Sequence, residues 1–339
     1  MTPWNRTTRS IGTAIAACTI AAAALFYLSF ARGKTANASP APDLLSALPA
    51  GAPTLIYIDL AAVRTSPFYQ HRRDKAPIAV PNQEYADFVH STGFDYEKDL
   101  DRVVIAAWPA PSGKEPGQIV SIAEGRFDRA KIQDYAARKG KLDHQQGHDV
   151  FLFPANDHKG MDSFTFLDDH RIALVAGTSI APLFAPSYNA SAADPTRERA
   201  ARLDGAAAFL ISRVPPIPDK AAGGAQGAAT AQMLSLARSV QWITLAARPE
   251  GDNLRISLEG ECDTSTDAQQ IKSMLDVMRM FGRSALESPN SQKSMDPATL
   301  AMLQTLLTSA EVTQAAERVR ILIELTPDIF KLSDTHKPQ

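Results

Sequence analysis

The apolar positions of the chain begin with one unbroken run near the N-terminus. Ile11–Phe30 comprises twenty residues and contains no charged side chain. A helix of that length spans roughly 30 Å at about 1.5 Å per residue, which matches the hydrocarbon thickness of a membrane. Arg6 and Arg9 precede the run, and Arg32 and Lys34 follow it. The pattern predicts a short tail over residues 1–10 and a transmembrane helix over residues 11–30.

Two other interpretations of this segment remain open. A cleaved signal peptide would use the small residues Ala36-Asn37-Ala38, although the apolar run exceeds the usual length of about 7–15 residues. A lipoprotein would begin at Cys18, although the apolar run continues well beyond that cysteine. We therefore expect the anchor to stay attached to the mature protein.

The charges that flank the anchor are balanced, so the positive-inside rule does not fix its orientation. A short tail before a large domain favours a tail inside and a domain outside, because long domains translocate largely regardless of charge. We expect a single-pass protein with its main domain on the extracytoplasmic, periplasmic side. Residues 31–53 are rich in Ala, Pro and Ser and predict a tether. Within it, Leu44, Leu45 and Leu48 predict a short turn that docks on the domain.

Beyond the tether, short β-like runs alternate with amphipathic helical segments. The predicted strands are 54–59, 103–108, 118–124, 150–153, 164–167, 172–175, 242–247, 254–259 and 319–325. The predicted helices are 60–69, 82–92, 129–139 after an Asp128 cap and before Gly140, 265–281 after a Thr264-x-x-Asp267 capping box, and 299–307. Residues 187–204 and 214–229 are loop-like. Most connections between strands predict hairpins, which favours an α+β fold with mainly antiparallel sheets over a doubly wound parallel fold.

Three segments recur in the same order in the two halves of the chain, which predicts an internal duplication. Gly51–Ile58 resembles Gly205–Ser212, the hairpin and helix of 103–139 resemble those of 241–281, and 171–184 resembles 319–332. The domain boundaries follow from this repeat. We expect a first repeat over 54–188, a linker and the first strand of the second repeat over 189–230, the remainder of the second repeat over 231–332, and a tail over 333–339.

Composition and charge exclude several classes of protein. Hydrophobic residues make up 45% and charged residues 21% of the chain, which excludes collagen-like, coiled-coil and wholly disordered proteins. The net charge is -2, so no basic field favours nucleic acid as a partner. Of the two cysteines, Cys18 lies in the apolar run, so Cys262 has no partner for a disulfide within the main domain.

Two segments resemble a known group of proteins. Leu48-Pro49-Ala50-Gly51-Ala52-Pro53, leading into a strand that ends at Asp59, and the passage Gly93–Val103 are similar to bacterial extracytoplasmic proteins of domain-of-unknown-function families. The resemblance covers residues 48–125. It implies an N-terminal membrane anchor and an outward-facing α+β domain, and it implies no catalytic residues.

The strongest local candidate for chemistry is His144-Gln145-Gln146-Gly147-His148-Asp149. If Gln146-Gly147 forms a hairpin turn, His144 and His148 become cross-strand neighbours that can share a metal ion. Asp143 or Asp149 can add a carboxylate. The alternative is a pair of exposed histidines beside a turn, and no third ligand lies at a fixed spacing. We therefore predict no catalytic residue, cofactor or metal, with His144, His148 and Asp149 as the alternative metal site.

The remaining patterns favour structural roles. Asp95, Glu97, Asp99 and Asp101 alternate as in a calcium loop but lack its turn glycine and its final glutamate, so we expect a solvated turn. The chain contains no G-x-S-x-G elbow, Gly113-Lys114 lacks the upstream glycine of a phosphate loop, and the Gly-rich run 223–227 follows prolines, as in a linker. Cys262 predicts a quiet thiol, and Met274 and Met278 predict core packing of the 265–281 helix.

Taken together, these features predict a membrane-anchored extracytoplasmic protein, and they favour a binding or scaffolding role over an enzymatic one. Its partners would be the membrane, through Ile11–Phe30, and an envelope protein or a small ligand. Two alternatives stay open: a metal-dependent hydrolase that uses His144 and His148, and a carrier of lipids or other hydrophobic ligands with a cleft between the repeats.

Overall fold

The computed structural model of the protein describes residues 42–73, 83–110, 117–154, 160–184, 194–216 and 236–327. The strands are β1 Thr54–Asp59, β2 Leu100–Trp108, β3 Gln118–Gly125, β4 Lys141–Gln145, β5 His148–Pro154, β6 Met161–Phe166, β7 Arg171–Ala176, β8 Ala208–Arg213, β9 Val240–Glu250, β10 Asn253–Cys262, β11 Glu311–Ala315 and β12 Arg318–Leu325. The helices are α2 Pro42–Ser46, α3 Leu60–Thr65, α4 Pro67–Arg73, α5 Gln83–Thr92, α6 Tyr96–Asp99, α7 Arg129–Lys139, α8 Pro195–Ala201, α10 Ser265–Glu287, α11 Pro289–Ser294 and α12 Pro297–Ser309, with a 3-10 turn η1 at Ala181–Phe184.

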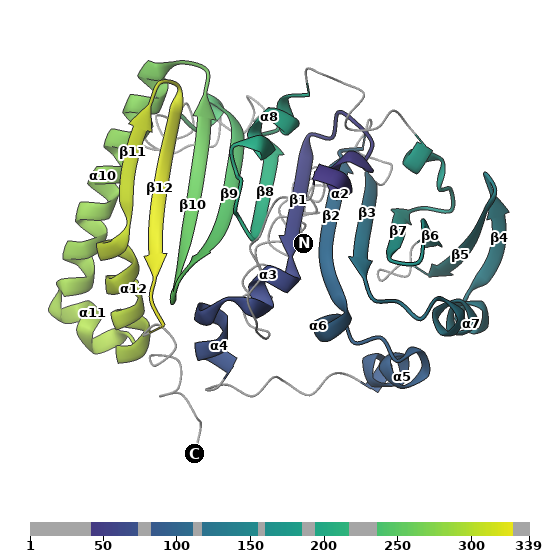
Figure 1. Cartoon of the computed structure of the whole chain (residues 1–339). Helices are drawn as coiled ribbons and strands as arrows, with labels where there is room; N and C mark the ends of the chain where they lie inside the picture. The colour runs from purple at the N-terminus through teal and green to yellow at the C-terminus, as the bar shows by residue number, and fades with distance from the viewer. Residues whose placement is uncertain are drawn as a thin grey trace, which may run out of the picture.

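All the described strands belong to one 12-stranded sheet, in the order β11-β12-β10-β9-β8-β1-β2-β3-β7-β6-β5-β4. Each neighbouring pair is antiparallel, which confirms the predicted α+β class with antiparallel pairing. Strands β1 and β8 meet at the centre, and Figure 1 shows the N-terminal strands to one side of them and the C-terminal strands to the other.

The two faces of the sheet are packed differently, and we name them after two neighbouring residues of β1. The Tyr57 face holds the largest apolar cluster, to which Val104, Ile122, Phe209 and Ile211 contribute. The Ile58 face holds smaller clusters beneath helices. These are the clusters of Leu60 on α3, Phe68 on α4, Ile132 on α7 and Ile271 on α10.

Part of the predicted tether packs against the domain. Residues 42–46 form α2, and Leu44, Leu45 and Leu48 are buried in the cluster of the Tyr57 face. The short turn expected at these leucines is therefore confirmed, because three leucines can leave water only by docking on the sheet.

The predicted N-caps of two helices are confirmed, because the side chains of Asp128 and Thr264 accept backbone N–H groups at the starts of α7 and α10. Asp59, which the sequence did not single out as a cap, does the same for α3. Gly140 ends α7 but has a φ of -132°, so it is not the left-handed C′ residue that we expected. A Cβ at this position would lie 2.2 Å from the Leu152 carbonyl oxygen, so close approach to β5 explains the glycine.

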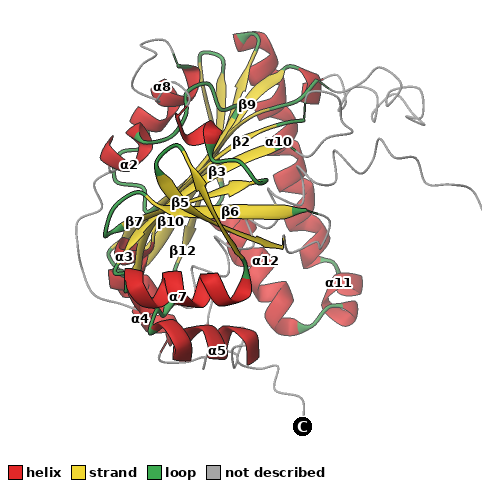
Figure 2. Ribbon diagram, turned by 90° about the vertical axis from the view of Figure 1, so that its right-hand side faces the viewer, coloured by secondary structure: helices red, strands yellow, loops and turns green. Residues whose placement is uncertain are grey.

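Figure 2 shows α5 and α7 side by side, and the structure supplies their contact. The rings of Phe88 on α5 and Tyr135 on α7 meet edge to face at 5.3 Å. Phe94, which follows α5, stacks on Phe127 at 5.1 Å. These aromatic contacts join α5 to the N-terminal half of the sheet.

Several elements differ from the prediction: β4, α6, α11 and η1 were not predicted, and three further differences concern α8, α3 with α4, and β11. The segment 187–204 was expected to be a loop, but residues 195–201 form α8, with Asp194 as N-cap and Pro195 in the first turn. The single helix expected over 60–69 is two helices, because Ser66 adopts an extended conformation before Pro67. Residues 311–315 form the edge strand β11, which the pattern did not predict.

The predicted apolar face of α10 is buried only over its first turns. Ala268 and Ile271 are buried and Met274 and Leu275 partly so, whereas Met278 is exposed and Phe281 is 64% exposed. The prediction that Met278 packs in the core is therefore wrong. The helix continues to Glu287, and α11 and α12 follow it.

Some predicted segments lie outside the described residues, namely the anchor at 11–30, most of the linker at 214–229 and residues 328–332. Among the residues that the structure does describe, none of the helices is both long and apolar enough to cross a membrane.

Candidate functional site

The β4–β5 hairpin carries the histidine pair but directs its two rings to opposite faces. Gln146 and Gly147 form the turn, with φ values of 52° and 82°. His144 is therefore paired with Asp149, and Gln145 with His148. Since successive residues of a strand point to opposite faces, His144 shares a face with Asp149 and not with His148. The expectation that the two histidines become cross-strand neighbours is wrong.

Local partners occupy the polar groups of this hairpin. His144 Nδ1 lies 2.8 Å from Asp149 Oδ1, and the ring of His148 lies 5.5 Å from that of Phe184. Hydrogen bonds from the Gln145 side chain and from the His144 backbone lower the pKa of Asp143. Within the described parts of the chain, no three His, Cys, Asp or Glu side chains are grouped as a metal site requires.

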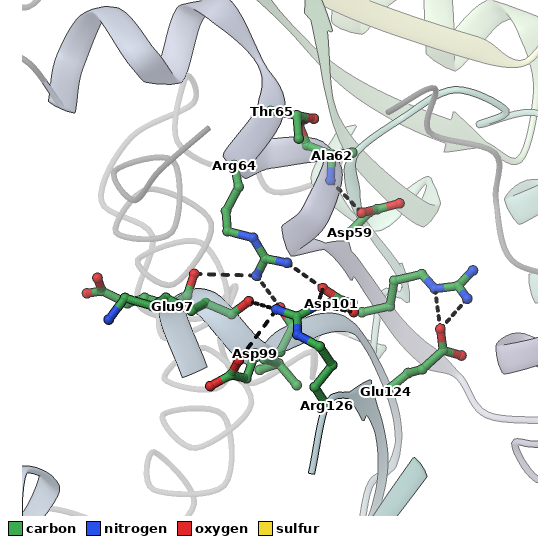
Figure 3. A network of polar contacts seen from close by, with 12 residues as sticks. Asp59, Ala62, Arg64, Thr65, Glu97, Asp99, Asp101, Glu124 and Arg126 are labelled. Carbon is green, nitrogen blue, oxygen red and sulfur yellow. Dashed lines mark hydrogen bonds and ion pairs between the residues drawn. The ribbon is translucent and has the colours of Figure 1, made fainter. Parts of the chain in front are cut away.

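The acidic run 95–101 is neutralised by basic side chains of its surroundings (Figure 3). Asp95 accepts the Glu97 N–H at 3.0 Å and the Lys98 ammonium at 2.6 Å. Arg64 and Arg126 both bind the Asp101 carboxylate. The run is thus a set of helix caps and ion pairs that joins α3 to the start of β2.

Asp59 is a buried carboxyl at the end of β1. It caps α3 by accepting the Ala62 N–H at 2.7 Å, and the Tyr57 hydroxyl lies 3.4 Å from its other oxygen. Burial raises the pKa of Asp59, against the opposing effects of the Ala62 hydrogen bond and the positive charge of Arg102. The cap accounts for its position, so we assign Asp59 a structural role.

Cys262 lies beneath α10 at the end of β10. The thiol is buried, and burial together with the charge of Asp267 raises its pKa. A raised pKa keeps the sulfur as the weakly reactive thiol at neutral pH.

The Tyr57 face changes character between the two halves of the sheet. In the N-terminal half, Val104, Ile122 and Ala173 are aligned across β2, β3 and β7 and are fully buried. In the C-terminal half, the corresponding row across β9, β10 and β12 is Thr244, Glu259 and Arg320. The apolar core that covers this face in the N-terminal half is thus replaced by charged groups in the C-terminal half.

The charged groups form an arginine cluster, which we define as Arg199, Arg202, Arg318 and Arg320 together with Glu259 and Glu261. Glu259 is buried, and three guanidinium groups approach its carboxylate. Arg320 Nη2 lies 2.5 Å, Arg202 Nη2 3.6 Å and Arg318 Nη1 4.0 Å from its oxygens. Glu261 binds Arg199, and Arg202 Nη2 lies 3.4 Å from its second oxygen.

Arg199 is the buried member of the cluster, with 8% of its side chain exposed. Its guanidinium lies over the Trp242 ring at 4.1 Å and donates to the Pro195 carbonyl at 2.8 Å. Its Nε is buried and has no hydrogen-bond partner among the described residues. Helix α8, which the sequence did not predict, carries Arg199 and places Arg202 at its C-terminus.

A second surface feature lies on the distal part of α10. Val277, Met278, Met280 and Phe281 are exposed there. A hollow of about 450 Å³ adjoins them, and all its lining residues belong to α10: Asp276, Arg279, Met280, Arg283, Ser284 and Glu287. This hollow is not the cleft between the two halves that a lipid carrier predicts.

Sequence reasoning did not single out the arginine cluster. Its signal was present as two alternating patterns, Glu259-x-Glu261 and Arg318-x-Arg320. The predicted strands 254–259 and 319–325 include Glu259 and Arg320, whereas Glu261 and Arg318 lie just outside them. Only the pairing of β10 with β12, which brings Glu259 opposite Arg320 and Glu261 opposite Arg318, makes these patterns meaningful.

Comparisons with known proteins give only distant similarity. No family model matches the chain, and no curated protein matches it. Crystal forms III and IV of TP0453 each align with a TM-score of 0.45 and 10% identity, over 86% and 87% of this chain and 98% and 97% of theirs. Crystal form I aligns with a TM-score of 0.43 over 86% of this chain and 96% of its own.

Proposed function

We propose that the chain is a single-pass, membrane-anchored protein whose α+β domain lies on the extracytoplasmic side and binds a partner or ligand at the cell envelope. The charge-free run Ile11–Phe30 with its basic flanks supports the anchor. The resemblance of residues 48–125 to extracytoplasmic domain-of-unknown-function families supports the location.

We also propose that the domain arose by internal duplication. The sequence alignment of Gly51–Ile58 with Gly205–Ser212 places Ile56 on Leu210, and these two residues face each other across β1 and β8. It also carries the pair Thr54–Ser212 onto Ala208–Ile58, which is another pair of the same ladder. Gly51 and Gly205 have φ values of 75° and 78°. If the first half of the chain is superposed on the second and the second on the first, each residue pair between β1 and β8 falls on another such pair. A two-fold repeat requires this property.

The charged Tyr57 face of the C-terminal half is the observation that carries the binding role. Arg318 and Arg320 are 37% and 47% exposed, whereas the matching row of the N-terminal half is closed by an apolar core. Burying charges without full pairing is costly, so such a face is better stabilised by water or by a charged partner than by packing. A face that diverges in this way between two similar halves favours binding over structural support.

The location is tested by labelling from outside the cell membrane. Asp169, in the highly exposed β6–β7 turn, is replaced by cysteine in the full chain. We expect a membrane-impermeant maleimide to label Asp169→Cys in intact spheroplasts. The parent chain should stay unlabelled, because Cys262 is buried and Cys18 lies within the proposed anchor. Labelling only after lysis would place the domain in the cytoplasm. N-terminal sequencing that begins at Ser39 would overturn the anchor.

Binding is tested by arginine modification with phenylglyoxal in isolated envelopes and in the purified protein. We expect Arg318 and Arg320 to be protected in envelopes and modified after purification. Arg138 on α7 serves as the control, because it is 56% exposed and lies on a helix of the Ile58 face. Equal modification of Arg318 and Arg320 in both preparations would contradict a binding role for this face.

A further inference from the structure

The arginine cluster carries more positive charge than its carboxylates neutralise. Four guanidinium groups face the two carboxylates of Glu259 and Glu261. The side chains that adjoin Glu259 and Arg320 along the same row, Thr244 and Thr313, are uncharged. Two positive charges therefore remain without a counter-ion among the described residues of the cluster.

The donors of the cluster are also only partly used. Arg320 gives Nε and Nη2 to one oxygen of Glu259, at 3.0 and 2.5 Å. The Arg318 guanidinium approaches the same carboxylate at 4.0 Å, and its side chain makes no hydrogen bond to the side chain of another described residue. Because arginine has five N–H donors in a fixed fork, Arg318 and Arg320 keep donors for a further acceptor.

Simple pairing of strands does not require this arrangement. In the N-terminal half, Glu124 on β3 is bound by Arg102 of the neighbouring strand, and one guanidinium serves one carboxylate. In the C-terminal half, three arginines from α8 and β12 share the carboxylate of Glu259. Glu259 is fixed beneath them, so it holds the guanidinium groups together despite their mutual repulsion.

The buried Arg199 adds an independent observation. It is held by Glu261, by the Pro195 carbonyl and by the Trp242 ring, yet its buried Nε has no partner in the part of the chain that the structure describes. Buried donors in folded proteins are nearly always satisfied by a protein group, a water or a ligand. The unmet donor and the excess charge occur in the same cluster.

We propose that the arginine cluster binds a phosphate-type dianion, with Arg202, Arg318 and Arg320 as its ligands. A phosphate group carries a charge of about -1.5 to -2 at neutral pH and offers three strong acceptor oxygens, which match both the excess charge and the free donors. A single carboxylate needs only one forked arginine. This inference rests on the proposed binding role of the face and names the chemistry of its ligand.

The group has two sources, a soluble phosphate compound and the headgroup of an anionic lipid, and the experiment has an arm for each. The purified protein is titrated calorimetrically with inorganic phosphate and pyrophosphate at low salt, with acetate as the carboxylate control. In parallel, it is sedimented with vesicles of phosphatidic acid in phosphatidylcholine and with vesicles of phosphatidylcholine alone. Each arm is repeated with the variants Arg318→Gln and Arg320→Gln.

Arg255→Gln is the matched control, because Arg255 lies on the same face, is similarly exposed and is paired with Glu250. We expect Arg318→Gln and Arg320→Gln to weaken binding at least about tenfold, since a charge-assisted hydrogen bond is lost. Arg255→Gln should leave binding unchanged. Circular dichroism and the melting temperature identify any variant that fails to fold, and the other arginine variant then decides.

Binding of free phosphate alone assigns a soluble ligand, and arginine-dependent sedimentation with phosphatidic acid assigns a lipid headgroup. Absence of binding in both arms, or equal binding of acetate, overturns the inference. Binding that persists in both arginine variants overturns it as well. The outcomes of the Asp169→Cys labelling and of the Arg318 protection experiment do not depend on these results. The proposed function can therefore fail or hold independently of the phosphate site.

Discussion

Ile132 of α7 and Ile271 of α10 are buried on the same face of the sheet, although their helices lie over opposite halves of it. Ile132 packs against Ile172 of β7, and Ile271 packs against Val319 of β12. The strand register carries Ile172 and Val319 to the Ile58 face. Each helix therefore follows a hairpin and returns across the same side of its strands.

Truncation of either isoleucine should destabilise the protein strongly. We expect Ile132→Ala and Ile271→Ala each to lower the free energy of unfolding by about 2–5 kcal/mol, because transfer energy is lost and a cavity remains. The exposed Lys131→Ala and the partly exposed Lys272→Ala are the controls on the same helices and should cost under about 0.5 kcal/mol. Chemical denaturation measures all four. A small effect at either isoleucine would show that its helix is not anchored there.

Phe281 on the same α10 should behave differently from Ile271. Phe281 is 64% exposed and Ile271 is 7% exposed. Since an exposed ring gains little from folding, we expect Phe281→Ala to change the free energy of unfolding by less than about 0.5 kcal/mol. The denaturation midpoint in urea measures it. A loss as large as that of Ile271→Ala would mean that the distal part of α10 is covered in solution.

Gly140→Ala should destabilise the protein although the glycine has an ordinary φ. The new Cβ would lie 2.2 Å from the Leu152 carbonyl oxygen and 3.3 Å from that of Ala136, so α7 and β5 would have to separate. We expect a cost of more than about 1 kcal/mol in thermal or urea unfolding. Gly160→Ala is the control, because no atom lies within 4 Å of its Cβ position. A neutral Gly140→Ala would contradict the close approach of the two elements.

The raised pKa of Asp59 predicts a dependence of stability on pH. Between the ordinary aspartate pKa of about 3.9 and the raised value, the folded state holds the proton more tightly than the unfolded state, so this residue's contribution falls as pH rises. Asp59→Asn keeps a capping side chain and removes the charge. We expect the variant to gain stability relative to the parent as the pH rises from the ordinary aspartate pKa through the raised pKa of Asp59.

The reference for that experiment is Asp59→Ala, which removes the hydrogen bond from the Ala62 N–H. This variant should lose about 0.5–2 kcal/mol through the missing cap. Melting temperatures of the three proteins across the pH range give the comparison. A constant difference between the parent and Asp59→Asn would show that the carboxyl is not destabilised by burial.

Local sequence patterns predicted most of the secondary structure because they depend on neighbouring residues. The limits of β1, the cap of Thr264 and the turn at Gly251-Asp252 all follow from alternation, capping chemistry and turn residues. Helix α8 was missed although Asp194-Pro195 is a helix-start signal, because the surrounding composition favours a loop.

The arrangement of side chains across strands was not predictable in this way. A two-residue turn at Gln146-Gly147 is enough to separate His144 from His148, since one step along a strand reverses the face. The ion pair between Glu259 and Arg320 depends on the register between β10 and β12. Because these strands are far apart in the sequence, local patterns do not give that register. The exposure of Phe281 depends on tertiary packing around α10, which helical periodicity does not encode.

The pairing of β1 with β8 has a consequence for the order of folding during synthesis. Tyr57 stacks on Phe209 at 5.2 Å, and the cluster around them draws side chains from both halves of the chain. While only the N-terminal half has left the ribosome, β1 is an edge strand with unpaired backbone groups, and Tyr57 lacks its partner ring. The largest core therefore closes only after β8 emerges, so the two similar halves form one cooperative unit and not two independently folding domains.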